Sequence, residues 1–174
     1  MHARPRLPAV AAALLSLALI SPAHADVQRF TDPRNDTSSS VDIRSVRVDN
    51  STADRSAVVV AVQQDDVRIG DSIEIFVDTR PADPGPEFSI SGYVASEYVM
   101  HHRENWKNPG RMVPFRCGYR MRINEATDRT RVVMSRNCLG EPGKVRVAVL
   151  VERDASSTHD WAKARRTWLG WVSR

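Results

Sequence analysis

Three aspartates near the start of the chain have the type and spacing expected of a cation site. Asp32, Asp36 and Asp42 lie in or just after a polar segment that also contains Asn35. Ca²⁺ takes about six to eight oxygen ligands, which carboxylates and loop carbonyls supply. Asp and Asn side chains also commonly accept hydrogen bonds from turn backbone. The segment therefore predicts either a structural calcium site or a capped turn.

Four tryptophans are the second group whose chemistry points to a ligand. Trp106 stands alone, whereas Trp161, Trp168 and Trp171 fall in the last fourteen residues. Indole rings offer flat apolar faces with one polar edge, which suits stacking on a sugar. Tryptophan also commonly covers a sheet or fills a core. The four positions are candidate ligand-binding residues if at least one ring is accessible.

The two cysteines of the chain predict a disulfide-closed β-hairpin. If Cys117 faces Cys138, the turn falls between Thr127 and Asp128. The same register pairs apolar residues with one another, namely Met121 with Met134 and Ile123 with Val132. Because side chains alternate along a strand, these residues share one face of the hairpin. The pairing of the cysteines and the pairing of the apolar residues thus predict the same strand register.

The first twenty-five residues predict a signal peptide. Arg4 and Arg6 precede an apolar run over residues 7–20, and a small-x-small cleavage motif follows at residues 23–25. The run is short for a membrane span. We expect cleavage after residue 25, secretion to the extracellular space, and one domain over residues 26–174. An oxidising compartment would allow the disulfide to form.

The charge of the chain argues against nucleic acid as a partner. The formal net charge is +4, and loss of Arg4 and Arg6 with the leader lowers it to +2. Nucleic-acid-binding domains usually carry a larger, clustered excess. Three arginines on the outward face of the hairpin either hold an acidic polymer of the cell envelope or keep that face soluble: Arg120, Arg122 and Arg131.

Short alternating segments separated by turns predict an all-β fold. We expect strands near residues 28–30, 42–50, 57–62, 72–79, 87–92, 97–101, 144–151 and 167–172, and on both arms of the hairpin. Strands at intervals of about ten residues, without a helical period, are typical of an antiparallel β-sandwich. The predicted fold is a jelly-roll-like sandwich with one disulfide-closed hairpin. Residues 153–159 are predicted to form a loop.

Two stretches resemble a known family. Residues 70–79, Gly-Asp-Ser-Ile-Glu-Ile-Phe-Val-Asp-Thr, resemble a strand of family-nine carbohydrate-binding modules and related DOMON-like sandwiches. The opening Asp32-Pro33-Arg34-Asn35-Asp36, followed by Asp42-Ile43, resembles the start of such domains and of small exported actinobacterial proteins. The resemblance implies binding of sugar chain ends by Trp106 and one C-terminal tryptophan, and a structural calcium ion. The disulfide hairpin is not part of the family pattern.

Three functions are compatible with these residues. The first is an exported, non-catalytic module that binds a glycan. The alternative is a structural or protein-interaction domain with no small-molecule ligand. The third is a hydrolase whose carboxylates are positioned by the fold and cannot be located from sequence. The chain has no nucleophile elbow, Walker loop or dinucleotide-binding glycine motif, so no catalytic residue is predicted.

Overall fold

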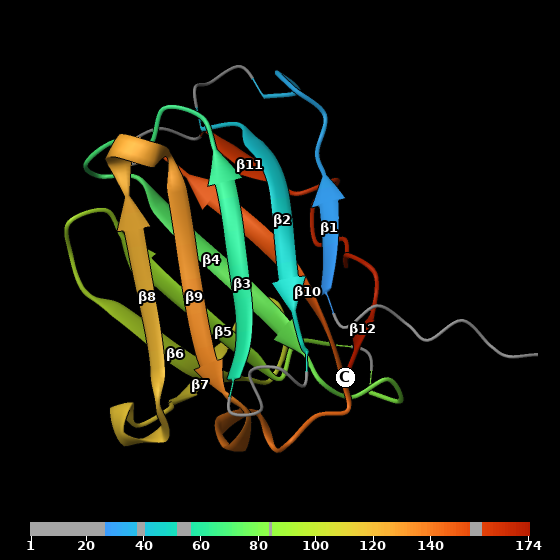
Figure 1. The fold of residues 1–174 in the computed structure, drawn as a ribbon. Coiled ribbons are helices and arrows are strands. Elements are labelled where there is room, and N and C mark those ends of the chain that lie inside the picture. Colours follow the sequence, from blue (N-terminus) through green and yellow to red (C-terminus); the bar gives the residue numbers. More distant parts are fainter. Residues whose placement is uncertain (1–26, 38–40, 52–56, 84, 154–157) are drawn as a thin grey trace, which may run out of the picture.

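The computed structural model of the chain describes residues 27–37, 41–51, 57–83, 85–153 and 158–174. It shows two antiparallel β-sheets packed face to face (Figure 1). The predicted all-β sandwich is therefore confirmed. The predicted signal peptide lies outside the described residues. Within the described residues, no helix has the length and apolar character needed to cross a membrane.

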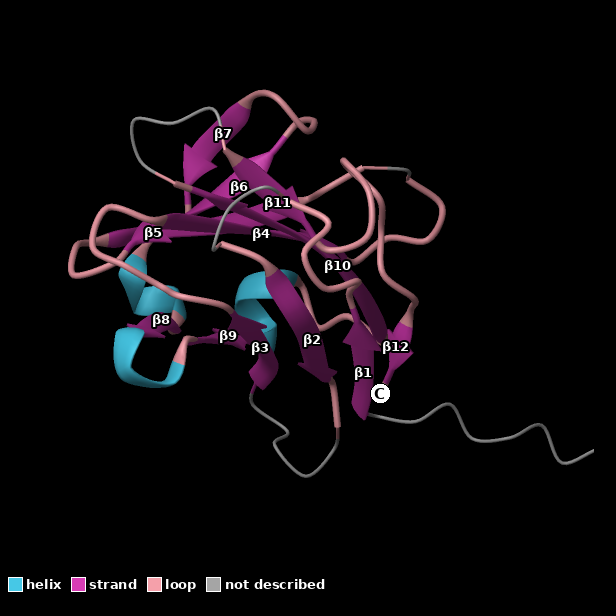
Figure 2. Cartoon of the chain, turned by 90° about the horizontal axis from the view of Figure 1, so that it is seen from above, coloured by secondary structure: helices cyan, strands magenta, loops and turns pink. Residues whose placement is uncertain are grey.

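The two sheets are built from segments that alternate along the chain. The first sheet contains, in spatial order, β1 (Val27–Thr31), β2 (Ile43–Asp49), β3 (Ala57–Gln64), β9 (Arg129–Ser135) and β8 (Tyr119–Asn124). The second contains β11 (His159–Trp161), β10 (Lys144–Glu152), β4 (Ser72–Asp78), β5 (Phe88–Tyr93), β6 (Tyr98–Arg103) and β7 (Pro109–Met112), with β12 (Val172–Ser173) also paired to β10. The described residues also contain three short 3-10 helices: η1 (Phe115–Cys117), η2 (Glu125–Thr127) and η3 (Arg136–Leu139). Seen from above, the two sheets form separate layers (Figure 2).

The main core lies between the two sheets. Ile73, Ile75 and Val77 alternate along β4 and point inward, and they are at most 2% exposed. Facing residues of β3, such as Val58 and Val60, are fully buried. Burying each such side chain stabilises the fold by about 1.5–3 kcal/mol. The period of two in the sequence therefore fixes which face of each strand enters the core.

The outer face of the second sheet carries a smaller apolar cluster. Phe76 of β4, Ala148 of β10 and Trp161 of β11 are buried there. Trp106 and Trp168 pack against them and are partly buried. Phe76 alternates with the core residues of β4, so this strand is covered on both faces. The tryptophans thus form a layer outside the sandwich rather than part of its main core.

The hairpin of β8 and β9 has a different register from the predicted one. Met121 pairs with Val132, two residues from the predicted partner, and the chain turns through η2 with Asp128 in the left-handed region at φ 50°. A shift of two residues keeps every side chain on its predicted face. The predicted opposition of the cysteines within the ladder is therefore wrong, because the η2 turn centres the hairpin earlier in the chain.

The predicted disulfide between Cys117 and Cys138 is confirmed. The two cysteines lie beyond the strand ends, in η1 and η3, with their Cα atoms 5.4 Å apart. The hairpin is thus closed by a turn at one end and by a covalent bond at the other.

Two strands were not expected from the sequence, and one is shorter than expected. The predicted loop over residues 153–159 ends in β11, where Trp161 pairs with Leu150. Strand β7 lies between the predicted strand over residues 97–101 and the predicted hairpin, where no strand is expected from the sequence. The predicted last strand over residues 167–172 is reduced to β12, in which Val172 and Ser173 pair with Val145 and Lys144 of β10.

Candidate functional site

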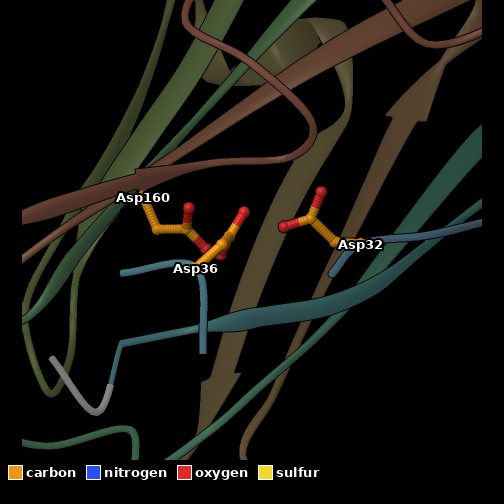
Figure 3. Close-up of side chains that lie close together, drawn as sticks. All are labelled: Asp32, Asp36 and Asp160. Atoms are coloured by element: carbon orange, nitrogen blue, oxygen red, sulfur yellow. The ribbon is translucent and has the colours of Figure 1, made fainter. Parts of the chain in front are cut away.

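Three carboxylates from distant parts of the chain meet at one end of the sandwich. Asp32, Asp36 and Asp160 each offer an oxygen atom, and these atoms lie within 4.8 Å of one another (Figure 3). Asp32 follows β1, Asp36 follows a turn at Asn35, and Asp160 is the middle residue of β11. The group therefore joins the loop after the edge strand of the first sheet to the edge strand of the second.

Asp42, the third predicted metal ligand, has a different role in this structure. Both of its carboxylate oxygens accept a hydrogen bond from the backbone N–H of Asn35 at 3.1 Å. Its carboxylate also forms an ion pair with Arg44 at 3.4 Å. Asp42 thus caps the turn that leads into Asp36. The structure brings two of the three predicted ligands together and adds Asp160.

The carboxylates of this cluster differ in burial and in hydrogen bonding. Asp32 is 8% exposed and Asp160 is 6% exposed, whereas Asp36 is exposed. One oxygen of Asp160 accepts a hydrogen bond from the backbone N–H of Ile43 at 2.7 Å. Oδ1 of Asp32 accepts a hydrogen bond from the backbone N–H of Lys163. Oδ2 of Asp32 is buried and has no hydrogen-bond donor among the described residues.

In the part of the chain that the structure describes, the negative charge of the cluster is not balanced by an ion pair with Lys or Arg. Burial raises the pKa of Asp32 to about 6, against the hydrogen bond from Lys163 and with help from the charges of Asp160, Asp36 and Asp42. Burial likewise raises the pKa of Asp160 to about 6. Both pKa values are higher than the pKa of an aspartate in the unfolded chain. Ionisation of Asp32 and Asp160 at neutral pH therefore lowers the free energy of unfolding. This loss of stability is relieved as the pH falls through about 6. Within the described residues, no Lys or Arg side chain forms an ion pair with the cluster.

A shallow groove lies on the outer face of the second sheet. Its volume is about 220 Å³. Its aromatic lining comes from Phe76, Trp106 and Trp161, and its polar lining includes Glu74, Glu152, Arg165 and Arg166. The ring of Trp161 stacks on Phe76, with centroids 5.7 Å apart and planes at 14°. Aromatic faces beside charged groups are suited to a ligand that has both apolar faces and hydroxyls.

The four predicted tryptophans are not equivalent in this structure. Trp106 lies 5.0 Å from Phe76 and 4.6 Å from Trp168, measured between ring centroids. Trp161 is only 8% exposed, whereas the other three rings are half-buried. Arg146 separates Trp171 from the groove, because its guanidinium lies over both Trp168 (5.0 Å) and Trp171 (4.6 Å). The structure thus gathers three of the four rings, and two of them line the groove.

The polar residues of the groove were not expected as site residues. Glu74 is visible in the sequence as an outward position of β4, but its proximity to Glu152 depends on the pairing of β4 with β10. No protein-family model, curated protein or solved structure matches this chain. Its function therefore has to be inferred from the geometry of these sites.

Proposed function

We propose that this chain is an exported, non-catalytic β-sandwich module that binds a glycan in the outer-face groove. The observation that carries the proposal is the half-buried ring of Trp106 beside charged side chains in one open groove, with the buried rings of Phe76 and Trp161 packed against it. Sugar rings stack their apolar faces on aromatic rings, and their hydroxyls bond to carboxylates and guanidinium groups. Export is proposed from the leader sequence of residues 1–25.

The groove is held in place before any ligand arrives. Arg103 forms an ion pair with Glu74, and its guanidinium lies 5.0 Å from the centroid of Phe76. Arg146 pairs with the fully buried Asp78 at 2.6 Å. A site whose side chains are already ordered loses less entropy on binding. These contacts support a binding role for this face.

The family resemblance and the groove involve the same segment. Glu74 and Phe76 belong to the stretch that resembles the carbohydrate-binding modules, and both line the groove. This overlap supports glycans as the class of ligand, although no match to that family was found.

Replacing Trp106 by Ala is expected to weaken glycan binding by at least about tenfold. The change removes an aromatic surface from the groove, and tenfold in affinity corresponds to about 1.4 kcal/mol. The measurement is binding of the secreted protein to a glycan array, followed by titration calorimetry with the best ligand. The exposed Glu152→Gln provides a second groove variant that leaves the aromatic packing intact.

Trp171→Ala is the matched control, because this tryptophan lies outside the groove and stacks with Arg146 and Lys144. The affinity of the Trp171→Ala variant for the glycan should stay within about twofold of the wild-type affinity. Equal losses in the Trp106 and Trp171 variants would contradict the assignment of the groove. Release of reducing ends from any bound polysaccharide would replace the proposal with a hydrolase.

A further inference from the structure

We propose that Asp32, Asp36 and Asp160 bind a calcium ion that joins the two sheets of the sandwich. One oxygen of each lies within 4.8 Å of the others. Two oxygens on opposite sides of a Ca²⁺ ion, each at about 2.4 Å, are themselves about 4.8 Å apart. Carboxylates are hard oxygen ligands, and the exposed Asp36 leaves the site open to an ion and its water molecules. The spacing and the ligand type therefore suit this cation.

The unpaired oxygen of Asp32 is an independent observation that points to a cation. Asp32 is 8% exposed, and its Oδ2 has no hydrogen-bond donor among the described residues. A buried carboxylate oxygen without a partner is costly. The carboxylate of Asp32 points toward Asp36 and Asp160 (Figure 3). A bound cation would satisfy this oxygen and balance the charge of all three carboxylates.

Calcium fits this site better than magnesium or zinc. Mg²⁺ demands an octahedron of ligands at about 2.0–2.1 Å, whereas Ca²⁺ accepts irregular sets of longer bonds. Zinc sites in proteins usually include His or Cys. The three ligands proposed here are all carboxylates, supplied by a loop and an edge strand. Selection for calcium follows from ligand type and from the spacing of the oxygens.

The ion would add a link between two segments that already meet through the hydrogen bonds from Ile43 to Asp160 and from Lys163 to Asp32. Asp160 lies between His159 and Trp161, which both line the glycan groove. Asp32 and Asp36 lie on the loop that leaves the edge strand of the other sheet. Binding at this site would therefore stabilise the fold and fix β11 behind the groove.

The test is a calcium titration of the full chain after removal of metals with EDTA at pH 7.5. We expect one equivalent of Ca²⁺ to bind by calorimetry, and the melting temperature to rise by roughly 5–10 °C at a hundredfold excess over Kd. The same concentration of Mg²⁺ should give less than half this shift. The exposed Asp36→Asn variant should fold normally and lose at least about tenfold in calcium affinity.

Asp83→Asn is the control, because Asp83 is an exposed aspartate that pairs with Arg80 away from the cluster. It should bind calcium like the wild type. The absence of a calcium-dependent shift in the wild type would overturn the proposal, as would equal losses in the Asp36 and Asp83 variants. A larger shift with Zn²⁺ or Mg²⁺ than with Ca²⁺ would overturn the choice of metal.

A second inference comes from the outer face of the first sheet. Four arginines lie in register across its five strands: Arg29 pairs with Arg47, Arg47 with Ala61, Ala61 with Arg131, and Arg131 with Arg122. We call this set the arginine row. It spans four strand spacings, or about 19 Å. We infer that the arginine row binds a linear acidic polysaccharide.

The charges of the arginine row are mostly uncompensated. Arg47 pairs with Asp49 at 2.9 Å. Within the described residues, no carboxylate forms an ion pair with Arg29, Arg122 or Arg131. Like charges placed directly opposite on neighbouring strands are destabilising. A surface that only had to be soluble would not require this alignment, whereas an anionic partner would offset its repulsion.

The form of the surface favours a polysaccharide over other polyanions. A hollow of about 380 Å³ at the edge strand β8 is lined by Arg120, Arg122 and Arg131, and by one aromatic ring, Tyr98 of the second sheet. The outward positions of the five strands, all of which the structure describes, carry no aromatic side chain. Single-stranded nucleic acids usually stack on aromatic rings. Guanidinium groups bind carboxylates and sulfates in paired hydrogen bonds.

The test compares two double variants that remove the same charge. Arg122→Gln/Arg131→Gln should weaken binding to polygalacturonate or heparin by at least about tenfold at low salt. Arg68→Gln/Arg80→Gln removes two exposed arginines from elsewhere and should cost less than about twofold. Trp106→Ala should leave this binding unchanged, which separates the arginine row from the glycan groove.

Equal losses in the two double variants would show that only net charge matters and would overturn the assignment. Failure of the wild type to bind either polymer would do the same. Binding to a thymidine oligonucleotide or to phosphatidylglycerol vesicles that is as tight as binding to the polysaccharides would replace the proposed partner.

Discussion

A protein that ends at Thr167 is expected to be unfolded at 25 °C. The deleted segment contributes Leu169 and Val172 to the main core, and these are 2% and 0% exposed. Replacing one such side chain by Ala costs about 2–5 kcal/mol. The loss of both, together with the ring of Trp168 over the outer cluster, is comparable to the whole stability of a typical domain.

The deleted segment also supplies hydrogen bonds that hold the sandwich together. The backbone N–H of Leu169 donates to the carbonyl of Val147 at 2.9 Å. The buried amide of Asn50 donates to the carbonyl of Val172 at 2.9 Å. Truncation therefore leaves polar groups of both sheets without partners, and each costs about 1–3 kcal/mol.

Circular dichroism and urea unfolding of the truncated and full chains provide the measurement. The milder variants Leu169→Ala and Val172→Ala should remain folded and lose about 2–4 kcal/mol each. Removal of Arg174 alone should change little, because this exposed residue contributes a terminal backbone hydrogen bond to Gly143. A truncated protein that melts like the full chain would show that the tail is an accessory.

Replacing both Cys117 and Cys138 by Ala is expected to cost about 3 kcal/mol of folding free energy. The disulfide closes a loop over a sequence separation of 21 residues, and the chain-entropy model assigns about 3 kcal/mol to a loop of this size. The melting temperature should fall by roughly 10 °C. The fold should persist, since β8 keeps its pairing with β9 and its buried residues Tyr119 and Met121.

Reduction of the wild-type protein with dithiothreitol is the internal control for this prediction. The reduced protein and the double variant should unfold at the same urea concentration. Thiol labelling of the denatured, unreduced protein should find no free cysteine. Two labelled cysteines would contradict the disulfide and remove one support for export.

The sequence predicted those parts of the fold that depend on local alternation. Ile73, Ile75 and Val77 show the period of two along β4, and Val145 and Val147 show it along β10. The alternation within each of these strands is enough to predict which of its side chains face the core. Strand β11 was missed because it has three residues, too few for a period to appear.

The candidate sites were less predictable, because they depend on contacts between distant segments. Asp160 and Asp32 lie close together in the fold but 128 positions apart in the sequence. No local sequence pattern around either residue indicates that the two meet. The arginine row likewise becomes visible only when the registers of four strand pairs are known. Asp42 is close to Asp32 and Asp36 in sequence, but its carboxylate caps the turn at Asn35.

The closed hairpin has a consequence for resistance to proteolysis. Its η2 turn is exposed, so Glu125 and Ala126 are accessible to a protease. A cut there would not release strand β8, because Cys117 and Cys138 lie on opposite sides of the cut and remain bonded. The nicked chain would run as one species under non-reducing conditions and as two fragments after reduction. An edge strand with a single neighbour is thus retained by the fold even when its turn has been cleaved.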